Sequence, residues 1–296
     1  MHLGNVAAAL LSWLSARARG GTWLLRIEDL DPQRSRPEYA RRIEDDLRWL
    51  GLDWDEGGTD DHGPAGPYSQ SRRSEIYSQF LGRLNDPGYT SPCRCTRAEI
   101  MATQAPHQSD GRVVYGGSCR PGALPCHGAD FTGAATRLFV PDSDIRYTDG
   151  LYGPQSFNLA REVGDFIVRR ADGAWAYQLA VVVDDALMGV TEVVRGSDLL
   201  LSAAQQIYLY RLLGLPTPHF THIPLLCNAD GRRLSKRDGD LSMAHLRATS
   251  SAPEVLGRLA ALLGIIPEYA PVEARDLVPI FSWTAVPRVM ELETKF

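Results

Sequence analysis

The stretch MHLGNVAAALLSWLSARARGG, residues 1–21, decides how this chain folds. It sets a His, a Gly and an Asn directly before an apolar run that ends at a pair of glycines. Asn5 is a favourable N-cap, and apolar side chains follow it at helical spacing: Val6, Leu10, Trp13 and Leu14. Gly4 leaves the backbone open to a flat ring, and a helix N-terminus attracts phosphate groups. The stretch therefore predicts a helix, and the residues before it are either the start of a phosphate-binding turn or a disordered end joined to a surface helix.

Strands and helices alternate after this first helix. Residues 22–31 predict a short buried strand that is followed by carboxylates. Residues 36–51 and 74–84 carry apolar side chains at helical spacing, and residues 199–214 predict a further helix that ends at Gly214. This alternation indicates an α/β fold.

The middle of the chain has a different composition. Residues 85–165 hold many Gly, Pro and Ser residues and four of the five cysteines, which predicts an inserted, loop-rich subdomain. Regular structure resumes at residues 166–180, where two strand-like runs flank Asp172 and Gly173, a typical hairpin turn. The residues after 240 predict helices and a proline-rich tail.

The bulk composition narrows the class of protein. With 296 residues, 44% of them hydrophobic, the chain can bury a sizeable core in one large or two ordinary domains. No apolar stretch approaches the ~20 residues that span a bilayer. A net charge of −5 and a pI near 5.8 argue against non-specific attraction to nucleic acid, so any RNA contact is expected to be local. An odd count of five cysteines indicates the reducing cytoplasm, with a metal as the competing use of thiols.

A basic segment in the last third of the chain concentrates cations. In GRRLSKRDGD, residues 231–240, four cationic side chains surround Ser235: Arg232, Arg233, Lys236 and Arg237. Such a segment suits a clamp that closes on a polyphosphate. On the basic cluster alone, a solvated surface loop is the commoner alternative.

These two segments together resemble the two signatures of the class I aminoacyl-tRNA synthetases. HLGN, residues 2–5, resembles the first signature, and RLSKR, residues 233–237, resembles the lysine-containing second one. The resemblance implies that ATP is bound with magnesium, through these residues: His2, Gly4, Asn5, Ser235 and Lys236. It also implies that catalysis rests on positioning and charge neutralisation by Lys236, His2 and Asn5.

Two longer segments narrow the family. Residues 25–57 resemble the stretch after the first signature in glutamyl-tRNA synthetases and their shortened relatives, and residues 175–206 resemble their amino-acid pocket. The resemblance implies that Glu28 and Tyr177 hold the amino group of glutamate and that Arg195 pairs with a carboxylate of glutamate. The chemistry agrees, because a carboxylate suits the planar fork of an arginine and an ammonium needs an acceptor. Without the resemblance, a solvated acid and a core aromatic residue would be the simpler explanations of Glu28 and Tyr177.

The chain resembles the short branch of this family most closely, the glutamyl-queuosine tRNA(Asp) synthetases. Only about sixty residues follow RLSKR, Val181 stands where the full-length enzymes usually have Asn, and residues 281–288 resemble the ending of the short enzymes. The resemblance implies ATP-dependent activation of L-glutamate and its transfer to queuosine in the anticodon loop of tRNA(Asp), by a cytoplasmic monomer without an anticodon-binding domain. Two alternatives stay open: a truncated glutamyl-tRNA synthetase that charges the tRNA 3′ end, and a non-catalytic tRNA-binding module.

A zinc site is expected in the inserted subdomain. Cys93-x-Cys95 and Tyr115-x-x-x-Cys119 match the zinc pattern of the short family, so the resemblance implies one structural Zn²⁺ held by these four residues. Tyrosine is an unusual ligand, and two nearby residues are alternatives to it: Cys126 and His127. Buried cysteines without a metal are the simpler alternative for the whole set. Cys227, far away in the sequence, is expected in the core.

The expected fold class is therefore α/β, with a class I synthetase Rossmann-like (HUP-type) parallel sheet, an inserted zinc-bearing subdomain and a short helical C-terminal region. The expected division is residues 1–84 for the first half of the nucleotide-binding domain, 85–165 for the zinc subdomain, 166–245 for the second half with the basic loop, and 246–296 for the C-terminal region.

The resemblance also raises an expectation about the start of the chain. In class I synthetases a central parallel strand leads into the first signature, whereas here Met1 stands directly before His2. We expect the natural protein to begin upstream of Met1, and we expect a version extended by such a strand to be more stable and to activate glutamate better.

Overall fold

The computed structural model describes residues 1–31, 33, 35–102, 114–120, 131–228 and 241–294. The first part of the chain forms these elements: α1 (Leu3–Ala18), β1 (Leu24–Leu25), α2 (Pro37–Trp49), β2 (Glu56–Gly57), η1 (Gln70–Arg72) and α3 (Ser74–Asn85). The next part forms these: β3 (Thr90–Cys93), α4 (Arg97–Ala102), β4 (Ala135–Leu138), β5 (Asp144–Asp149), β6 (Gly153–Asn158), α5 (Leu159–Glu162) and β7 (Phe166–Arg169).

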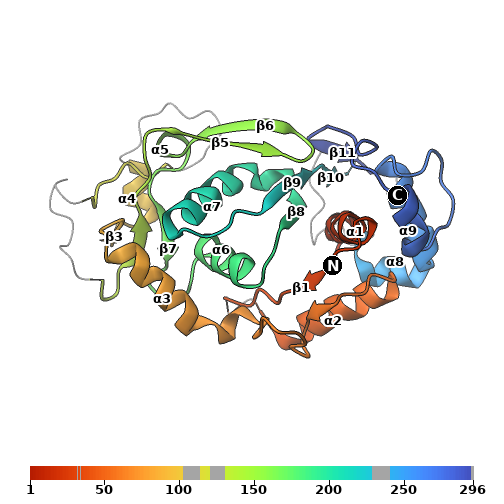
Figure 1. Cartoon of the computed structure of the whole chain (residues 1–296), viewed down its shortest axis with the longest axis horizontal. Helices are drawn as coiled ribbons and strands as arrows, with labels where there is room; N and C mark the ends of the chain where they lie inside the picture. Colours follow the sequence, from red (N-terminus) through yellow and green to blue (C-terminus); the bar gives the residue numbers. More distant parts are fainter. Residues whose placement is uncertain (32, 34, 103–113, 121–130, 229–240, 295–296) are drawn as a thin grey trace.

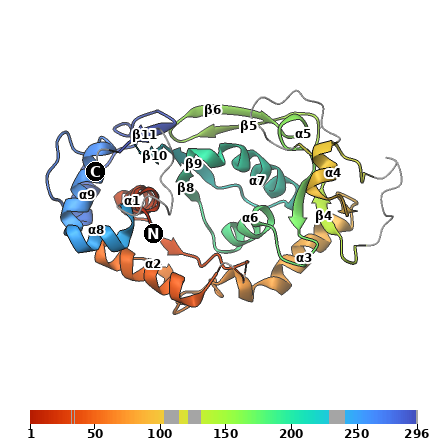
Figure 2. The same cartoon turned by 180° about the vertical axis from the view of Figure 1, so that it is seen from behind.

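The remaining elements complete an elongated molecule. They are α6 (Tyr177–Leu187), β8 (Glu192–Gly196), η2 (Ser197–Leu199), α7 (Leu200–Leu213), β9 (His219–Ile223), β10 (Leu225–Cys227), α8 (Met243–Thr249), α9 (Ala252–Leu262), α10 (Ala274–Leu277), η4 (Val278–Ile280) and β11 (Glu291–Glu293). Figure 1 shows the β5–β6 hairpin along one long edge and α2 and α3 along the opposite edge. Seen from behind in Figure 2, β4 and α9 lie toward opposite ends of the molecule.

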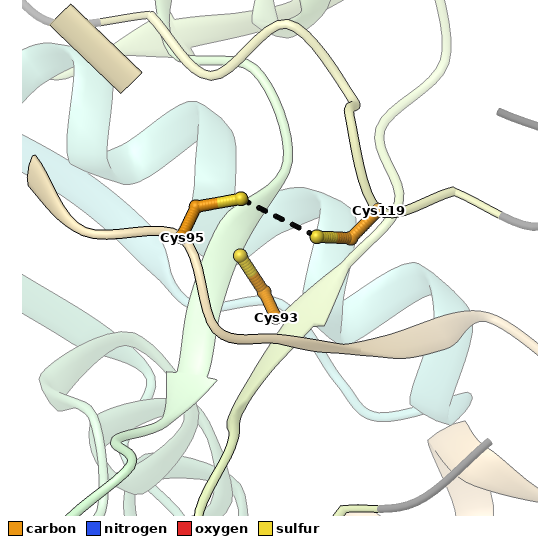
Figure 3. A group of neighbouring side chains, drawn as sticks. All are labelled: Cys93, Cys95 and Cys119. Atoms are coloured by element: carbon orange, nitrogen blue, oxygen red, sulfur yellow. Dashed lines mark hydrogen bonds between the residues drawn. The ribbon is translucent and has the colours of Figure 1, made fainter. Parts of the chain in front are cut away.

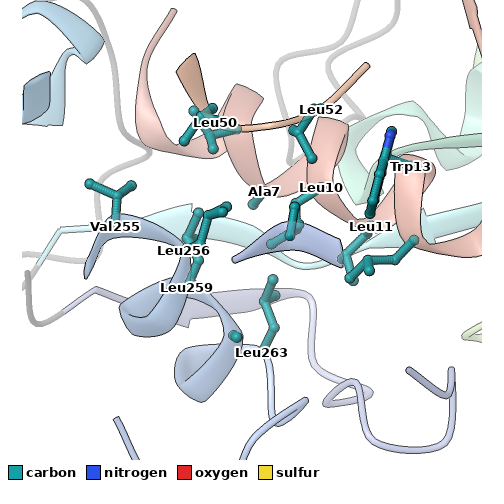
Figure 4. Close-up of a cluster of buried hydrophobic side chains, with 14 of the residues drawn as sticks. Ala7, Leu10, Leu11, Trp13, Leu50, Leu52, Val255, Leu256, Leu259 and Leu263 are labelled. Atoms are coloured by element: carbon teal, nitrogen blue, oxygen red, sulfur yellow. The ribbon is translucent and has the colours of Figure 1, made fainter. Parts of the chain in front are cut away.

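Helix α1 forms as the apolar spacing predicts, but its cap differs from the prediction. The N-cap is His2, and Asn5 lies three positions later, where its Oδ1 accepts a hydrogen bond from the His2 backbone N–H at 3.2 Å. Asn5 therefore supports the cap from inside the first turn. The apolar face of α1 is buried against α9 and the segment after α2, as Figure 4 shows for Leu10, Leu50 and Leu256.

Two parallel strand pairs form the α/β part of the molecule. Strand β1 pairs with β2, and β8 pairs with β9 along its full length. The predicted helices around them are confirmed: residues 36–51 contain α2, residues 74–84 lie in α3, and α7 ends at Gly214, whose φ of 63° closes the helix in the left-handed conformation.

The hairpin predicted for residues 166–180 is only half right. Strand β7 and the turn are present, with the Gly173 N–H donating to the Arg170 carbonyl at 3.0 Å, but only Trp175 bridges back to β7. Helix α6 then begins at Tyr177. Its Leu-Ala-Val-Val-Val run is buried on all sides, and such a run does not distinguish a buried helix from a strand.

Residues 85–165 contain more regular structure than the predicted loops. Strands β3 and β4 pair antiparallel, and β7 joins β4 on its other edge. Strands β5 and β6 form a regular antiparallel hairpin. Strand β7 begins at Phe166, just past the predicted end of the inserted subdomain, yet it belongs to the sheet of β3 and β4. The division of the chain into four regions stays a prediction.

The C-terminal region packs back onto the first helix. Residues of α8, α9 and α10 share one hydrophobic cluster with α1, and β11 pairs with β10 in parallel. Among the described residues, no helix combines the length and the apolar character needed to cross a membrane.

Candidate active site

A cavity of about 760 Å³ is lined by residues of both the β1–β2 pair and the β8–β9 pair. Helix α1, strand β1, helix α6 and strand β8 all contribute to its lining. Its size is that of a typical small-molecule site, because such sites span roughly 300–1,000 Å³. Three of the predicted residues line it: Glu28, Tyr177 and Arg195.

Helix α6 presents one stripe of side chains to the cavity. Tyr177, Val181 and Asp185 lie four residues apart, so they share one helix face, and all three line the cavity. Burial and the nearby charge of Glu28 raise the pKa of the Tyr177 phenol, while Arg195 lowers it. The phenol therefore stays protonated at neutral pH and can donate a hydrogen bond to a ligand.

Arg195 lines the cavity, and the side chains that accept its hydrogen bonds are neutral. Its Nε donates to His222 Nε2 at 3.1 Å, and one terminal nitrogen donates to Gln206 Oε1 at 2.8 Å. The guanidinium also stacks on Phe220, 5.0 Å from the ring centroid. Within the part of the chain that the structure describes, no carboxylate lies within ion-pair distance of Arg195. Its charge is therefore available to a bound anion.

Arg26 is a second cavity-lining arginine, which the sequence did not single out. It lies 2.6 Å from Asp185, 3.0 Å from Glu28 and 3.8 Å from Asp184. Burial opposes its charge, but these carboxylates outweigh burial and raise the pKa of Arg26. Glu28, predicted to hold an ammonium group, is thus already paired, although 40% of its side chain is exposed and its second oxygen faces no other cation in the described structure.

Asp184 anchors the helix that carries the cavity-lining stripe. Its carboxylate is fully buried and accepts hydrogen bonds from Arg73 at 2.6 Å, Gln70 at 2.8 Å and the Tyr77 phenol at 2.8 Å. A buried carboxylate needs such partners. The signal for Asp184 and its neighbour Asp185 was present in the sequence as two acids inside an apolar run, but the arginines that pair with them, Arg73 and Arg26, lie more than a hundred positions away.

The predicted ATP-binding residues lie outside the cavity or outside the described residues. His2, Gly4 and Asn5 form the N-terminus of α1 and do not line the cavity. His2 bridges to Ser242, and Met243 N–H donates to the Met1 carbonyl at 3.0 Å, so the residues after the basic segment lie beside this N-terminus. Ser235 and Lys236, with Arg232, Arg233 and Arg237, lie outside the described residues.

The side chains of three cysteines, Cys93, Cys95 and Cys119, point toward one another, as Figure 3 shows. The sulfur atoms of Cys93, Cys95 and Cys119 lie within 4.8 Å of one another, and the Cys95 and Cys119 sulfurs are 3.4 Å apart. The Tyr115 hydroxyl lies 3.7 Å from Cys93 Sγ and accepts the Cys119 backbone N–H at 2.7 Å. A tetrahedral zinc site with Zn–S bonds of about 2.3 Å places its sulfurs roughly 3.8 Å apart. The three sulfurs therefore lie at distances compatible with zinc, and the Tyr115 hydroxyl lies beside them.

The thiols and the phenol of this cluster differ in how readily they lose a proton. Burial and the neighbouring Cys119 and Cys93 thiols raise the pKa of Cys95 to about 12, and the same causes raise the pKa of Tyr115. For Cys93, burial is outweighed by hydrogen bonds, that of Arg137 first, and its pKa is lowered. Crowded thiols that resist deprotonation are readily deprotonated by a bound metal ion.

Cys126 and His127, the alternatives to Tyr115, lie outside the described residues. Cys227 is 2% exposed on β10, so its predicted place in the core is confirmed.

Comparison with known proteins extends these observations. A family model described as the catalytic domain of class I tRNA synthetases (E and Q) matches residues 1–278. The chain is 50% identical over 295 residues to the glutamyl-Q tRNA(Asp) synthetase of Symbiobacterium thermophilum, which covers 97% of this chain and 90% of that relative. It is 48% identical over 292 residues to the glutamyl-Q tRNA(Asp) synthetase of Nitratidesulfovibrio vulgaris, with the same coverage.

Solved structures give the same picture. A glutamate tRNA ligase from Elizabethkingia meningosepticum, determined in complex with its amino acid, superposes with a TM-score of 0.84 at 28% identity. A glutamate-tRNA synthetase from Elizabethkingia anophelis superposes with a TM-score of 0.85, also at 28% identity. The matches cover 99% and 100% of this chain but 64% and 66% of those chains, so this chain spans about two thirds of their length.

Proposed function

We propose, because this chain belongs to the class I glutamyl- and glutaminyl-tRNA synthetases and within them to the glutamyl-Q tRNA(Asp) synthetases, that it activates L-glutamate with ATP and transfers it to the queuosine base in the anticodon loop of tRNA(Asp). The family implies ATP with Mg²⁺, glutamate and a tRNA as its substrates. We infer a monomer that works in the cytoplasm.

The single observation that carries this proposal is the charge state of the cavity. Arg195 contributes a guanidinium whose side-chain partners are neutral, and Tyr177 contributes a protonated phenol beside it. A side-chain carboxylate of the substrate fits Arg195, while Glu28, whose side chain is 40% exposed, and the Tyr177 hydroxyl suit the substrate's amino end. Glutamate carries both groups.

The chemistry needs no strong general base. An oxygen of the glutamate α-carboxylate, already ionised at neutral pH, attacks the α-phosphorus of ATP. The bond to the bridging oxygen breaks, and pyrophosphate leaves as its magnesium complex. His2, Asn5 and Lys236 neutralise and orient the phosphates in this proposal. The bridge from His2 to Ser242 supports it, because it places a residue that follows the basic segment beside the start of α1. A hydroxyl of the acceptor then attacks the glutamyl carbonyl, the acyl–phosphate bond breaks, and AMP leaves while the hydroxyl proton passes to its phosphate.

Zinc is assigned a structural role. Cys93, Cys95, Cys119 and Tyr115 would hold it, and their spacing supports a closed set of four ligands with no position left for a substrate. When bound, zinc would tie β3 to the segment that carries Tyr115. The cluster and the cavity are built on different elements, so zinc takes no part in the proposed reaction.

The acceptor is tested with tRNA(Asp) prepared in three forms: carrying queuosine, lacking queuosine, and carrying queuosine but lacking the terminal adenosine. Radiolabelled glutamate should label the first and third forms and leave the second unlabelled. Labelling that needs the terminal adenosine and ignores queuosine would instead support a truncated glutamyl-tRNA synthetase. Labelling of no form, together with absent pyrophosphate exchange, would support the non-catalytic tRNA-binding module.

A further inference from the structure

Behind Arg195 lies a buried acid–imidazole pair. Asp149 ends β5 and His222 lies in β9, and both side chains are fully buried. His222 Nδ1 lies 2.6 Å from Asp149 Oδ2, and its Nε2 lies 3.1 Å from Arg195 Nε. The three side chains therefore form one line from the protein interior to the cavity.

The donors and acceptors fix the state of the imidazole. Arginine has no acceptor, so His222 Nε2 must offer its lone pair to Arg195. Asp149 already accepts the backbone N–H groups of Leu151 and Tyr152, both at 3.0 Å, and as an acceptor it requires a proton on Nδ1. His222 is thus a neutral imidazole with its proton on Nδ1, and burial lowers its pKa in the same sense.

We propose that the Asp149–His222 pair is a positioning device that aims the Arg195 guanidinium into the cavity and sets the affinity of the site for a substrate carboxylate. The inference rests on the proposed function. A carboxylate bonded directly to Arg195 would hold the guanidinium equally well but would neutralise it. A neutral ring in between keeps the orientation and leaves the positive charge for the substrate.

The opposite side of the guanidinium is fixed by a second neutral chain. Gln206 Oε1 accepts from Arg195 at 2.8 Å, Gln206 Nε2 donates to Gln178 at 2.7 Å, and Gln178 donates to Gln205 at 3.0 Å. The amide of Gln206 is thereby oriented with its oxygen toward Arg195. Every side chain that accepts a hydrogen bond from Arg195 in the described structure is neutral. This pattern leaves the positive charge of Arg195 for an anionic ligand.

The inference is tested by substitutions and glutamate-dependent ATP–pyrophosphate exchange. Asp149→Asn and His222→Phe should raise the KM for glutamate by about tenfold or more, leave the KM for ATP unchanged and change kcat by less than about threefold, since the loosened group binds the substrate in ground and transition states alike. His222→Gln keeps an acceptor for Arg195 and a donor for Asp149, so it should recover most of the affinity. Asp144→Asn, the same change in an exposed acid of the same strand, is the matched control.

A second measurement does not depend on how the variants fold. The ¹⁵N spectrum of the wild-type histidines should show His222 with a protonated Nδ1 and an unprotonated Nε2. The opposite tautomer, or an imidazolium at neutral pH, would overturn the inference, as would an unchanged KM for glutamate in folded His222→Phe and Asp149→Asn. Calorimetry separates this failure from a failure of the proposed function: wild-type protein that binds no glutamate would overturn both.

Discussion

Arg26 and Arg195 line the same cavity, but Arg26 is surrounded by carboxylates and Arg195 by neutral side chains. Three carboxylates surround Arg26, whereas the side-chain partners of Arg195 in the described structure are a neutral imidazole and an amide. Arg26 therefore belongs to the internal charge balance of the fold, and Arg195 is the cation that we propose for binding the substrate.

Replacing Arg195 should weaken the binding of glutamate. Loss of one partner of a desolvated charge pair costs about 2–5 kcal/mol, so Arg195→Gln should weaken glutamate binding roughly thirtyfold or more. Arg195→Lys should recover only part of it, because an ammonium lacks the planar fork. Calorimetry with glutamate measures both. Arg19→Gln removes a cavity-lining arginine that is 62% exposed and paired with Glu192, and it should bind glutamate normally.

Lys236 should act on the activation step and not on glutamate binding. If it neutralises charge that develops on the phosphates, Lys236→Ala should lower the rate of ATP–pyrophosphate exchange by about 10²–10³. Calorimetry should meanwhile give the wild-type affinity for glutamate. A variant with undiminished exchange would remove Lys236 from the mechanism.

Zinc content should depend on the four clustered residues. Purified protein is expected to hold about one tightly bound zinc per chain, and Cys93→Ser or Cys95→Ser should lose it, as elemental analysis would reveal. Tyr115→Phe tests the unusual fourth ligand: retention of zinc in that variant, with loss on replacing Cys126 or His127, would show that the fourth ligand is misassigned. Cys227→Ala alters a buried cysteine of β10 and should leave zinc content unchanged.

Local patterns predicted local structure well. Helix α7 ends at Gly214 because glycine adopts a φ of 63° at little cost, and that signal lies in the sequence itself. The start of α6 was missed, since a buried apolar run has no period that tells helix from strand. Tertiary packing determines that this run is helical.

The site was predictable to the extent that family motifs mark it. Tyr177, Glu28 and Arg195 do line one cavity, but the pairing of Glu28 with Arg26 was not visible, because nothing local reveals that Arg26 also reaches Asp185. The Asp149–His222 pair was not predictable for the same reason, because its two residues lie 73 positions apart. Long-range pairs of this kind follow from the fold and not from spacing.

Gly164 should be indispensable to the geometry of the thiol cluster. Its φ is 71°, it bridges to Tyr115, and an added Cβ would lie 2.0 Å from the Tyr115 carbonyl oxygen. Gly164→Ala should therefore displace Tyr115, lower the thermal midpoint and speed the loss of zinc to a chelator. Gly133→Ala is the matched control, because Gly133 has a φ of 64° with no atom near its Cβ position. Equal effects of the two variants would mean that backbone strain alone is responsible.

Mild acid should destabilise the protein through His222. Burial lowers its pKa, with Arg195 acting in the same direction and Asp149 opposing both. The unfolded chain therefore takes up a proton near pH 6.5 while the folded imidazole stays neutral, so the free energy of unfolding falls as the pH drops below about 6.5. Asp149 adds a separate loss at lower pH: burial would raise its pKa, but hydrogen bonds from His222 and the Tyr152 backbone lower it.

Thermal midpoints measured from about pH 7.5 down to pH 5 separate the His222 contribution, because that window lies above the titration of unfolded aspartates near 3.9. His222→Gln has no proton to take up at this position, so its midpoint should decline less steeply than that of the wild type. His245→Gln, on the exposed side of α8, should decline as the wild type does. If His222→Gln and the wild type lose stability in parallel, His222 is not the group that senses acid, and the neutral imidazole behind Arg195 carries no energetic cost on protonation.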